Sequence, residues 1–502
     1  MTEVELLLPE RLVPERLAAA ISSSGLIAED AGSESLQRTY YDTFDGRLAA
    51  VGTPAVYERG RLVLNGASAG LEGPPQRVLA ADLQPGPLRD ALAPLIDVRA
   101  LLPLAELQIH ERRLRILDSE RKTVVRASIE RSALAPSGDA LRARVRLVAL
   151  RGYDSELERV RTALQRELGL ETAPLSLIDE AVTALGGHPG GVSSRIDVPL
   201  SFGQRADEAA VAVLRRLLEV IQENVEGTIA DLDSEFLHDL RVSVRRSRSV
   251  QRQLRGVFRP DELGRFRSEF RWLQSVTGDS RDLDVYVLDF EDMRALVAAS
   301  LRADLDPLLG VLGKRRRAAH RRMIAALRSK RFTALLADWG VLLDRLPSLP
   351  DADRPDAATA IGALAGPRIA KVYQRIVADG QAIDEHGPSE PFHELRKRGK
   401  ELRYLLELFG SPLYPPEVVK PMVKTLKALQ DVLGRHQDRE IQTATLGSLA
   451  TELAGDQAAL LATGALIARL DDDKWAARKD FTARFARFAS NDQRTLVRDT
   501  FA

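Results

Sequence analysis

The spacing of apolar residues changes near the middle of the chain. Before residue ~175, short runs of β-branched residues alternate with turn formers, as in TVVRASIE (123–130) and ARVRLVAL (143–150), and this pattern predicts strands. From residue ~205, apolar residues recur at helical spacing almost to the end of the sequence, which predicts helices. The chain is therefore predicted to be α+β, with a strand-rich first part and an all-helical second part.

Gly/Pro-rich segments mark the predicted boundaries. GGHPGGVSS (186–194) separates the two patterns, and we predict a domain over 1–188, a linker over 189–204 and a helical domain over 205–495. Within the helical part, breaks are expected at 258–263, 346–356, 385–391 and 410–417. The segments between these breaks suit antiparallel helical bundles.

Composition limits the possible chemistry. Lys and Arg number 72 and Asp and Glu number 72, so any basic site must be local and balanced elsewhere. The chain has no cysteine, which excludes disulfides, thiolate metal sites and cysteine catalysis. The opening MTEVELLLPERL does not resemble an export signal, and AALLATGALIA (458–468) is shorter than the ~20 residues of a membrane helix. We expect a cytoplasmic protein with no membrane association.

An internal repeat carries the candidate chemistry. HDLRVSVRRSR from His238 matches HELRKRGKELR from His393, and LQSVTGDSRD from Leu273 matches LQDVLGRHQD from Leu429 in the same order. Each copy of the first motif has His at its first position and basic residues at its fourth, eighth and eleventh. These candidate binding residues are His238, Arg241, Arg245 and Arg248 in the first copy and His393, Arg396, Lys400 and Arg403 in the second.

The repeat places these cations on one side of a helix, and we call the four basic positions of each copy its basic stripe. At about 100° per residue, the four positions fall within an arc of about 80°, roughly 120° from the apolar residues. The stripe thus lies beside the apolar face of the helix and not opposite it, a position that can line a groove where two bundles meet. Arg, Lys and protonated His suit a phosphate-rich anion, and since His titrates near ~6.5, binding should strengthen at mildly acidic pH. The apolar residues are Leu240, Val244 and Leu254 in the first copy and Leu395, Leu402 and Phe409 in the second.

Further candidates lie outside the stripe. The segments GDSRD and GRHQD, after Gly278 and Gly434, resemble turns or helix ends in which Asp282 and Asp438 either cap a helix or orient a neighbouring cation. A third basic segment, KRRRAAHRRM, is expected to form another wall of the site. These segments and the second repeat add the anion-binding candidates Arg281, Lys314, Arg317, His320, Arg321, Lys397 and His436. We expect no metal site, because His238 and its neighbour Asp239 diverge on a helix among arginines, and we expect no cofactor. Phosphohistidine chemistry would need a site for ATP or a phosphotransfer partner, and the chain has no glycine loop of the G-x-x-x-x-G-K-[ST] type.

On these motifs, residues 205–495 resemble the conserved-histidine α-helical domain family, CHAD. The resemblance implies two four-helix bundles related by pseudo-twofold symmetry and a basic central cavity that contains the histidines. It also implies binding of inorganic polyphosphate and association with polyphosphate granules. Spacing alone leads only as far as a polyanion.

The first part resembles a degenerate CYTH domain, the triphosphate-tunnel fold, through Glu3, Glu5 and the segment QRTYYDTFDGRLAAVG (37–52). The resemblance implies a tunnel-like antiparallel β-barrel. The family's opening pattern ends in Lys, but Leu7 stands there, and only Arg59 and Arg61 remain where an arginine-rich strand is expected. Arg142, Arg144 and Arg146 stand where the resemblance implies metal-holding carboxylates. Tunnel enzymes use such carboxylates to hold Mg²⁺ or Mn²⁺, so we expect an inactive tunnel without catalytic residues, which either binds anions or serves as a structural or dimerising module.

The sequence thus predicts a non-enzymatic polyphosphate-binding protein. One alternative is a metal-dependent triphosphatase or polyphosphatase with its catalytic site in the first part. A second is a protein that binds nucleic-acid backbones, although an aromatic content of 5% and basic segments without interleaved aromatics argue against base stacking. The sequence makes no prediction of the oligomeric state.

Overall fold

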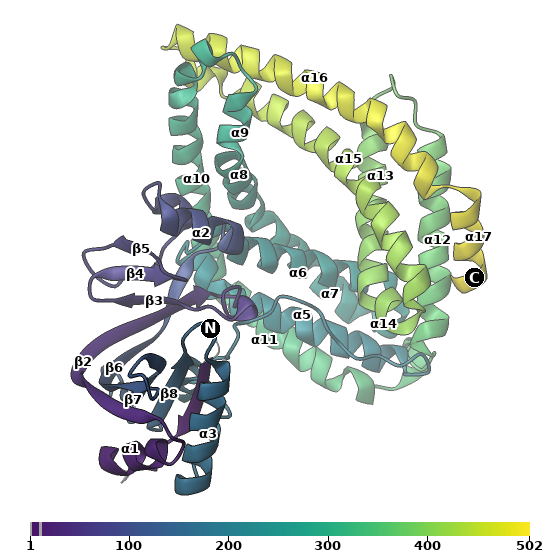
Figure 1. The fold of residues 1–502 in the computed structure, drawn as a ribbon. Helices are drawn as coiled ribbons and strands as arrows, with labels where there is room; N and C mark the ends of the chain where they lie inside the picture. Colours follow the sequence, from purple (N-terminus) through teal and green to yellow (C-terminus); the bar gives the residue numbers. More distant parts are fainter. Residues whose placement is uncertain (1–2, 10–12, 502) are drawn as a thin grey trace. The chain divides into compact units, whose positions relative to one another are not determined.

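The structure is a computed structural model that describes residues 3–9 and 13–501 (Figure 1). It divides into two compact units, unit 1 (Met1–Ser194) and unit 2 (Arg195–Ala502), and the division falls inside the segment 189–204. In the described residues, every strand belongs to unit 1, and unit 2 is helical. The predicted α+β class with two domains is confirmed.

Unit 1 is built on one antiparallel sheet of eight strands in the order β1-β8-β7-β6-β2-β3-β4-β5. β2 and β6 pair along most of their length, with Arg38 opposite Leu107. A closed barrel needs a hydrogen-bonded ladder between its edge strands, and in the described residues β1 and β5 are not paired, so the sheet is open and the barrel detail of the prediction is corrected. The strands are β1 (Glu3–Leu7), β2 (Ile27–Thr43), β3 (Ala55–Glu58), β4 (Arg61–Leu64), β5 (Ala67–Gly70), β6 (Leu101–Leu117), β7 (Thr123–Leu134) and β8 (Arg144–Ala149).

Helices cover parts of this sheet. The apolar sides of α1 and α3 share a core with inward residues of β7 such as Val125 and Ile129, which alternate with polar residues along the strand. α2 packs on a second core with β4, and α4 is capped by Ser176, whose hydroxyl accepts from the main-chain N–H of Asp179. The helices are α1 (Pro14–Ser22), α2 (Pro87–Ile96), α3 (Asp154–Leu168) and α4 (Leu177–Ala184).

Unit 2 repeats one order of helices. The first series of helices is α5, α6, α7 with α8, α10 and α11, and the second series is α12, α13, α15, α16 and α17. In each series the second helix carries the His-containing motif. None of the described helices is long and apolar enough to cross a membrane. The helices are α5 (Ala206–Ile229), α6 (Ser234–Gln253), α7 (Pro260–Val276), α8 (Gly278–Leu288), α9 (Phe290–Ala295), α10 (Asp306–Leu327), α11 (Lys330–Arg345), α12 (Ile361–Gln381), α13 (Glu390–Leu405), α14 (Ser411–Leu413), α15 (Pro416–Ser448), α16 (Gln457–Phe488) and α17 (Asn491–Phe501).

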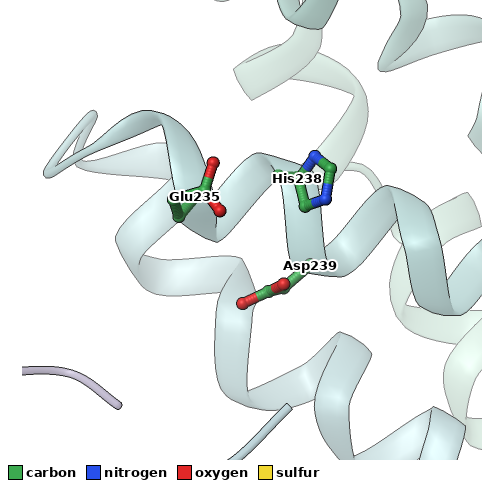
Figure 2. A group of neighbouring side chains, drawn as sticks. All are labelled: Glu235, His238 and Asp239. Atoms are coloured by element: carbon green, nitrogen blue, oxygen red, sulfur yellow. The ribbon is translucent and has the colours of Figure 1, made fainter. Parts of the chain in front are cut away.

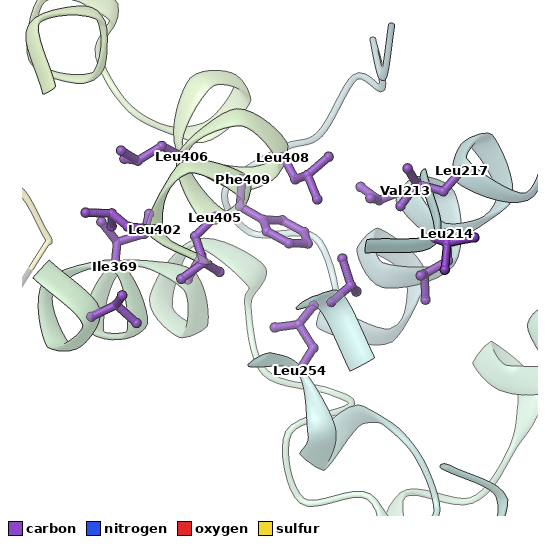
Figure 3. Close-up of a cluster of buried hydrophobic side chains, with 14 of the residues drawn as sticks. Val213, Leu214, Leu217, Leu254, Ile369, Leu402, Leu405, Leu406, Leu408 and Phe409 are labelled. Atoms are coloured by element: carbon purple, nitrogen blue, oxygen red, sulfur yellow. The ribbon is translucent and has the colours of Figure 1, made fainter. Parts of the chain in front are cut away.

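One apolar core joins the two repeats. Figure 3 shows Val213 and Leu217 of α5 in the same cluster as Ile369 of α12 and Phe409, which follows α13. Trp339 of α11 is fully buried in this core. The six residues predicted to form the apolar side of the repeats are all buried, as the helical spacing requires: Leu240, Val244, Leu254, Leu395, Leu402 and Phe409.

The second repeated motif folds differently in its two copies. In the first copy α7 ends at Val276 and α8 begins at Gly278, so the predicted helix end is present. In the second copy α15 runs without interruption through Gly434, and the turn predicted there is wrong. The buried Thr277 hydroxyl bonds the carbonyl of Leu273 at the break, whereas its counterpart Leu433 is a buried apolar residue that lets the helix continue. Asp282 and Asp438 therefore lie inside helices and are not caps.

Candidate functional site

Each repeat histidine contacts the second repeated motif. Nδ1 of His238 lies 3.0 Å from Nη2 of Arg281, and Nδ1 of His393 contacts Oε1 of Gln437, which occupies the same motif position as Arg281. A guanidinium only donates, so Nδ1 of His238 accepts, whereas the amide oxygen of Gln437 accepts from Nδ1 of His393. The two histidines are therefore held in different tautomers, and Nε2 of His238 carries the proton.

The arginines at the fourth motif position differ in burial. Arg241 is 8% exposed and donates to Oγ1 of Thr277 at 2.9 Å, which ties α6 to the break between α7 and α8. Burial lowers the pKa of Arg241 to about 10. Its counterpart Arg396 forms a 3.2 Å ion pair with Asp438. Asp438 thus orients a neighbouring cation, one of the two roles considered from the sequence.

The two stripes converge at Arg245 of α6 and Lys400 of α13. Burial is the main cause that lowers the pKa of Lys400 to about 7, and the positive charges of Arg396, Arg245 and Arg241 lower it further while Asp438 opposes them. Lys400 therefore lies within electrostatic range of two arginines from the other repeat. In the part of the chain that the structure describes, no hydrogen bond or ion pair engages Arg245 or Lys400. We call the convergent residues the central cluster: His238, Arg241, Arg245, His393, Arg396 and Lys400.

α6 and α13 are joined by ion pairs that follow the repeat. Arg246 donates to Glu407 at 2.7 Å, and Arg252 pairs with Glu401 at 3.1 Å. In the alignment of the repeats, Arg246 corresponds to Glu401 and Arg252 corresponds to Glu407. Each position thus pairs with the counterpart of the other, as expected at an interface with pseudo-twofold symmetry.

The remaining stripe residues have partners on their own or adjacent helices. Arg248 donates to Oε1 of Gln274 on α7. Its counterpart Arg403 donates to Glu407 at 2.6 Å, so this carboxylate neutralises part of its charge. Lys397 is exposed and pairs with a carboxylate of its own helix. The contact of Arg248 is therefore with a neutral amide, whereas carboxylates offset part of the charge of Arg403 and Lys397.

The third basic segment lies on α10. Lys314, Arg317 and Arg321 are exposed on the side of the helix away from its buried residues, and His320 is half-buried beside them. Across residues 3–9 and 13–501, no hydrogen bond or ion pair joins these four to the central cluster. The structure thus leaves them as a separate basic surface, and their predicted role as another wall of the site stays a prediction.

Sequence reasoning missed the α10 residue that connects to the rest of the unit. Arg316 donates to Asp231 and to Asp284, each at 2.6 Å, and this ties α10 to α8 and to the end of α5. The signal was hidden because Arg316 sits in a run of arginines. Its partners lie far away in the sequence, so no local pattern distinguishes it from its exposed neighbours.

His436 is placed in the core of the second repeat. It is 1% exposed, its ring stacks on Phe392, and Nε2 accepts from Nε of Arg478 at 3.0 Å. Burial, followed by the charge of Arg478, lowers the pKa of His436 to about 4, so the ring is neutral near pH 7. Because Nε2 accepts from Arg478, Nδ1 carries the proton of the neutral ring, and this atom is buried without a hydrogen-bond partner in the described residues. Burial argues against contact with a ligand, and the polyanion-binding role of His436 stays a prediction.

Three side chains at the start of α6 have the composition of a metal site (Figure 2). Glu235, His238 and Asp239 each have a ligand-type atom within 4.8 Å of the others, so the expectation that His238 and Asp239 diverge is wrong. The guanidinium of Arg281 lies 3.7 Å from Glu235 and 3.0 Å from Nδ1 of His238. A cation beside two of the three groups opposes a divalent ion. The group therefore fits an anion-binding role for His238 better than metal coordination.

Unit 1 has a cavity of about 580 Å³ between strands of its sheet and α4. Its lining includes Glu3, Glu5, Arg38, Glu58 and Arg146, with apolar side chains around them. Arg146 lies 3.0 Å from Glu3, and Arg38 lies 2.9 Å from Glu58. Sequence reasoning missed Arg38, whose contribution depends on the register of β2 with β3.

The residues of this cavity do not fit the divalent metal that the CYTH resemblance implies. Glu5 pairs with Arg144, which is fully buried and also pairs with Glu180 at 2.6 Å. Carboxylates that already neutralise arginines offer little to a cation. Arg59 and Arg61, the expected substitutes for phosphate-binding arginines, pair with other surface residues and do not line the cavity.

Comparison with known proteins identifies the domain family of the helical unit. Residues 212–447 match the family model described as CHAD domain, so this part of the chain is a CHAD domain. Two uncharacterized proteins, from two strains of Mycobacterium tuberculosis, are each 28% identical over 227 residues, which is 44% of this chain and 42% of the relative. The match thus spans less than half the length of these curated relatives.

Two solved structures are also similar to the chain. The CHAD domain from the plant Ricinus communis is 27% identical, with a TM-score of 0.47 over 58% of this chain and 96% of that chain. PptA from Streptomyces chartreusis is 20% identical, with a TM-score of 0.43 over 56% of this chain and 99% of that chain. The antiparallel sheet of unit 1 is consistent with the CYTH-like resemblance.

Proposed function

We propose that unit 2 binds inorganic polyphosphate without chemical turnover, through the central cluster, and that this binding brings the protein to polyphosphate granules. The observation that carries the proposal is the convergence of Arg241 and Arg245 from one repeat with Arg396 and Lys400 from the other. CHAD domains are associated with polyphosphate, and residues 212–447 are such a domain.

The electrostatics favour a ligand with many negative charges. Burial is the main reason why the pKa of Lys400 is about 7, and the charges of Arg396, Arg245 and Arg241 lower it further against the opposing charge of Asp438. A phosphate chain between the stripes would supply the missing negative charge and favour the protonated form of Lys400. The half-buried guanidinium of Arg245 is available as a donor to phosphate oxygens.

We propose that unit 1 is not a triphosphatase. Support comes from Glu3 and Glu5, which pair with Arg146 and Arg144, so that arginines already neutralise both of these carboxylates. An enzyme in this unit would release phosphate from tripolyphosphate in a metal-dependent way. Loss of that release in Glu3→Gln/Glu5→Gln would restore the enzyme hypothesis.

The first test is a titration of the full chain with fluorescent long-chain polyphosphate, with and without excess RNA. The test variant is His238→Ala/Arg245→Glu/His393→Ala/Lys400→Glu. A matched control, His188→Ala/His386→Ala/Lys479→Glu/Arg484→Glu, makes the same kinds of change at positions outside the cluster. Circular dichroism verifies that both variants keep their helicity.

We expect tight binding that the test variant loses, that the control keeps, and that RNA does not displace. Binding should weaken steeply with salt, because cations of the protein replace counterions of the polyanion. Absence of binding by the natural chain, or equal loss in both variants, contradicts the proposal. Easy displacement by RNA favours nucleic-acid backbone binding instead.

A further inference from the structure

α7 has opposite charges on its two sides. Glu262 and Glu269 lie on one side and pair with arginines of α11. At about 100° per residue, Arg267, Arg271 and Gln274 fall within about 60° of one another on the other side of the buried apolar residues. This second side therefore carries cations without carboxylates of its own helix. The buried apolar residues are Leu263, Phe266, Phe270 and Leu273.

The basic side of α7 faces α6. Arg248 of α6 donates to Oε1 of Gln274, which places its guanidinium against this side. Burial lowers the pKa of Arg248, and the charges of Arg271, Arg252 and Arg267 lower it further, so the four arginines gather in one place. Glu401 holds Arg252, but among the described residues no hydrogen bond or ion pair engages the exposed Arg267 or Arg271.

This group is continuous with the central cluster. Arg245 and Arg248 are three residues apart on α6, so their Cβ atoms lie about 5–6 Å from each other on the same face. An anionic chain bound at Arg245 can therefore pass directly to Arg248. From there it would meet the exposed guanidinium groups of α7 without leaving a basic surface.

The second repeat has only part of this group, because Lys427 stands at the position of Arg271. Aligning Leu273 with Leu429 puts Val423 at the position of Arg267. The counterpart of Arg248 is Arg403, which donates to Glu407. The pseudo-twofold symmetry of the helices is therefore uneven in charge: two exposed arginines extend the basic surface in the first repeat, where the second has one lysine, Lys427.

We propose that Arg248, Arg267 and Arg271 form a second phosphate-binding subsite. It takes the part of a polyphosphate chain that extends beyond the central cluster along α6 and α7. A bound chain would then extend preferentially from the central cluster along α6 and α7 of the first repeat. This inference rests on the proposed function, because it concerns the same ligand.

The test compares the natural chain with Arg267→Gln/Arg271→Gln, using short-chain and long-chain polyphosphate. Both side chains are exposed, so the substitutions leave the core intact. The matched control is Lys424→Gln/Lys427→Gln on α15, which removes the same charge from exposed residues of the second repeat, one of them the counterpart of Arg271. Affinity is measured over a range of salt concentrations.

We expect Arg267→Gln/Arg271→Gln to weaken long-chain binding roughly tenfold near ~0.1 M salt and to lower the salt slope by about 1.4, at about 0.7 per lost phosphate contact. Short-chain binding should change much less, and the control should keep both affinities. Equal weakening in the control, or no change in the test variant, overturns the subsite. If the natural chain binds neither polyphosphate, the proposed function itself fails, and this outcome is distinct from both.

Discussion

Arg246 on α6 donates a 2.7 Å hydrogen bond to Glu407, which follows α13, and so connects the two copies of the repeat. The related pair of Arg252 and Glu401 has its charges placed the same way, with both arginines in the first copy and both carboxylates in the second. Two identical copies would meet through like charges at these positions. The sequence difference between the copies therefore makes the pseudo-symmetric crossing electrostatically favourable.

Substitution of Glu407 should weaken folding. Glu407→Gln leaves Arg246 and Arg403 without their shared carboxylate, and both residues of the first pair are mostly buried, at 18% and 22% exposed. We expect a loss of roughly 1 to 3 kcal/mol in the free energy of unfolding, measured by chemical denaturation. In Arg246→Met/Glu407→Gln the combined loss should be smaller than the sum of the two single losses. If the losses in Arg246→Met and Glu407→Gln add up to the loss in the double variant, the ion pair contributes no coupling energy to folding.

The same substitution should strengthen ligand binding. Glu407 competes with a polyanion for Arg403, so Glu407→Gln frees this cation for phosphate. We expect tighter polyphosphate binding and a salt slope larger by about 0.7, as one more contact forms. Glu269→Gln, which frees Arg331 on the other side of α7, is the control and should leave both values unchanged. An unchanged slope in Glu407→Gln would exclude Arg403 from the site.

The sequence predicted which residues repeat but could not show what they contact. The basic and apolar faces of α6 and α13 follow from helical spacing, and Leu240 and Leu395 are buried as expected. The partners Glu401 and Glu407 bind across a crossing of helices distant in sequence, so no local pattern reveals them. His436 resembled a site residue, but stacking on Phe392 puts it in the core.

The pH dependence of binding should trace to Lys400 above pH ~7. Its pKa is about 7 in the free protein, chiefly because of burial, with Arg396, Arg245 and Arg241 adding to the effect and Asp438 opposing it. A bound polyanion favours the charged form, so binding takes up a proton and affinity falls as pH rises from about 7 to 9. Lys400→Arg stays charged over this range and should bind with much less pH dependence. Titrations at several pH values measure this.

The same group has a second, opposite effect on the free protein. Because the pKa of Lys400 is lower in the folded than in the unfolded chain, the unfolded state binds more protons between pH ~7 and ~10. The contribution of Lys400 to stability therefore increases as pH rises through this window. Lys400→Met should remove the increase, and an unchanged slope of unfolding free energy against pH would show that another group is responsible.

His436 should act through folding and not through the ligand. His436→Ala removes the stacking on Phe392 and the acceptor for Arg478, and we expect it to cost roughly 2 to 4 kcal/mol. Since its pKa of about 4 lies below that of an unfolded histidine, its contribution is present above pH ~6.5 and is lost as pH falls toward 4. The salt slope of polyphosphate binding by the folded variant should stay unchanged. A smaller slope would return His436 to the binding site.

Removal of divalent metals should leave binding unchanged. In the proposed site, Arg, Lys and His would hold the phosphate chain, and a chelator removes none of these donors. In unit 1, the carboxylates nearest the cavity pair with Arg144 and Arg146, so metal should neither bind there nor alter the affinity of unit 2. Polyphosphate titrations with EDTA and with added Mg²⁺ or Mn²⁺ measure this, after correction for the metal that polyphosphate itself binds. Chelator-sensitive affinity that disappears in Glu235→Gln/Asp239→Asn would instead assign a metal to the start of α6, where His238 would coordinate it and not the phosphate chain.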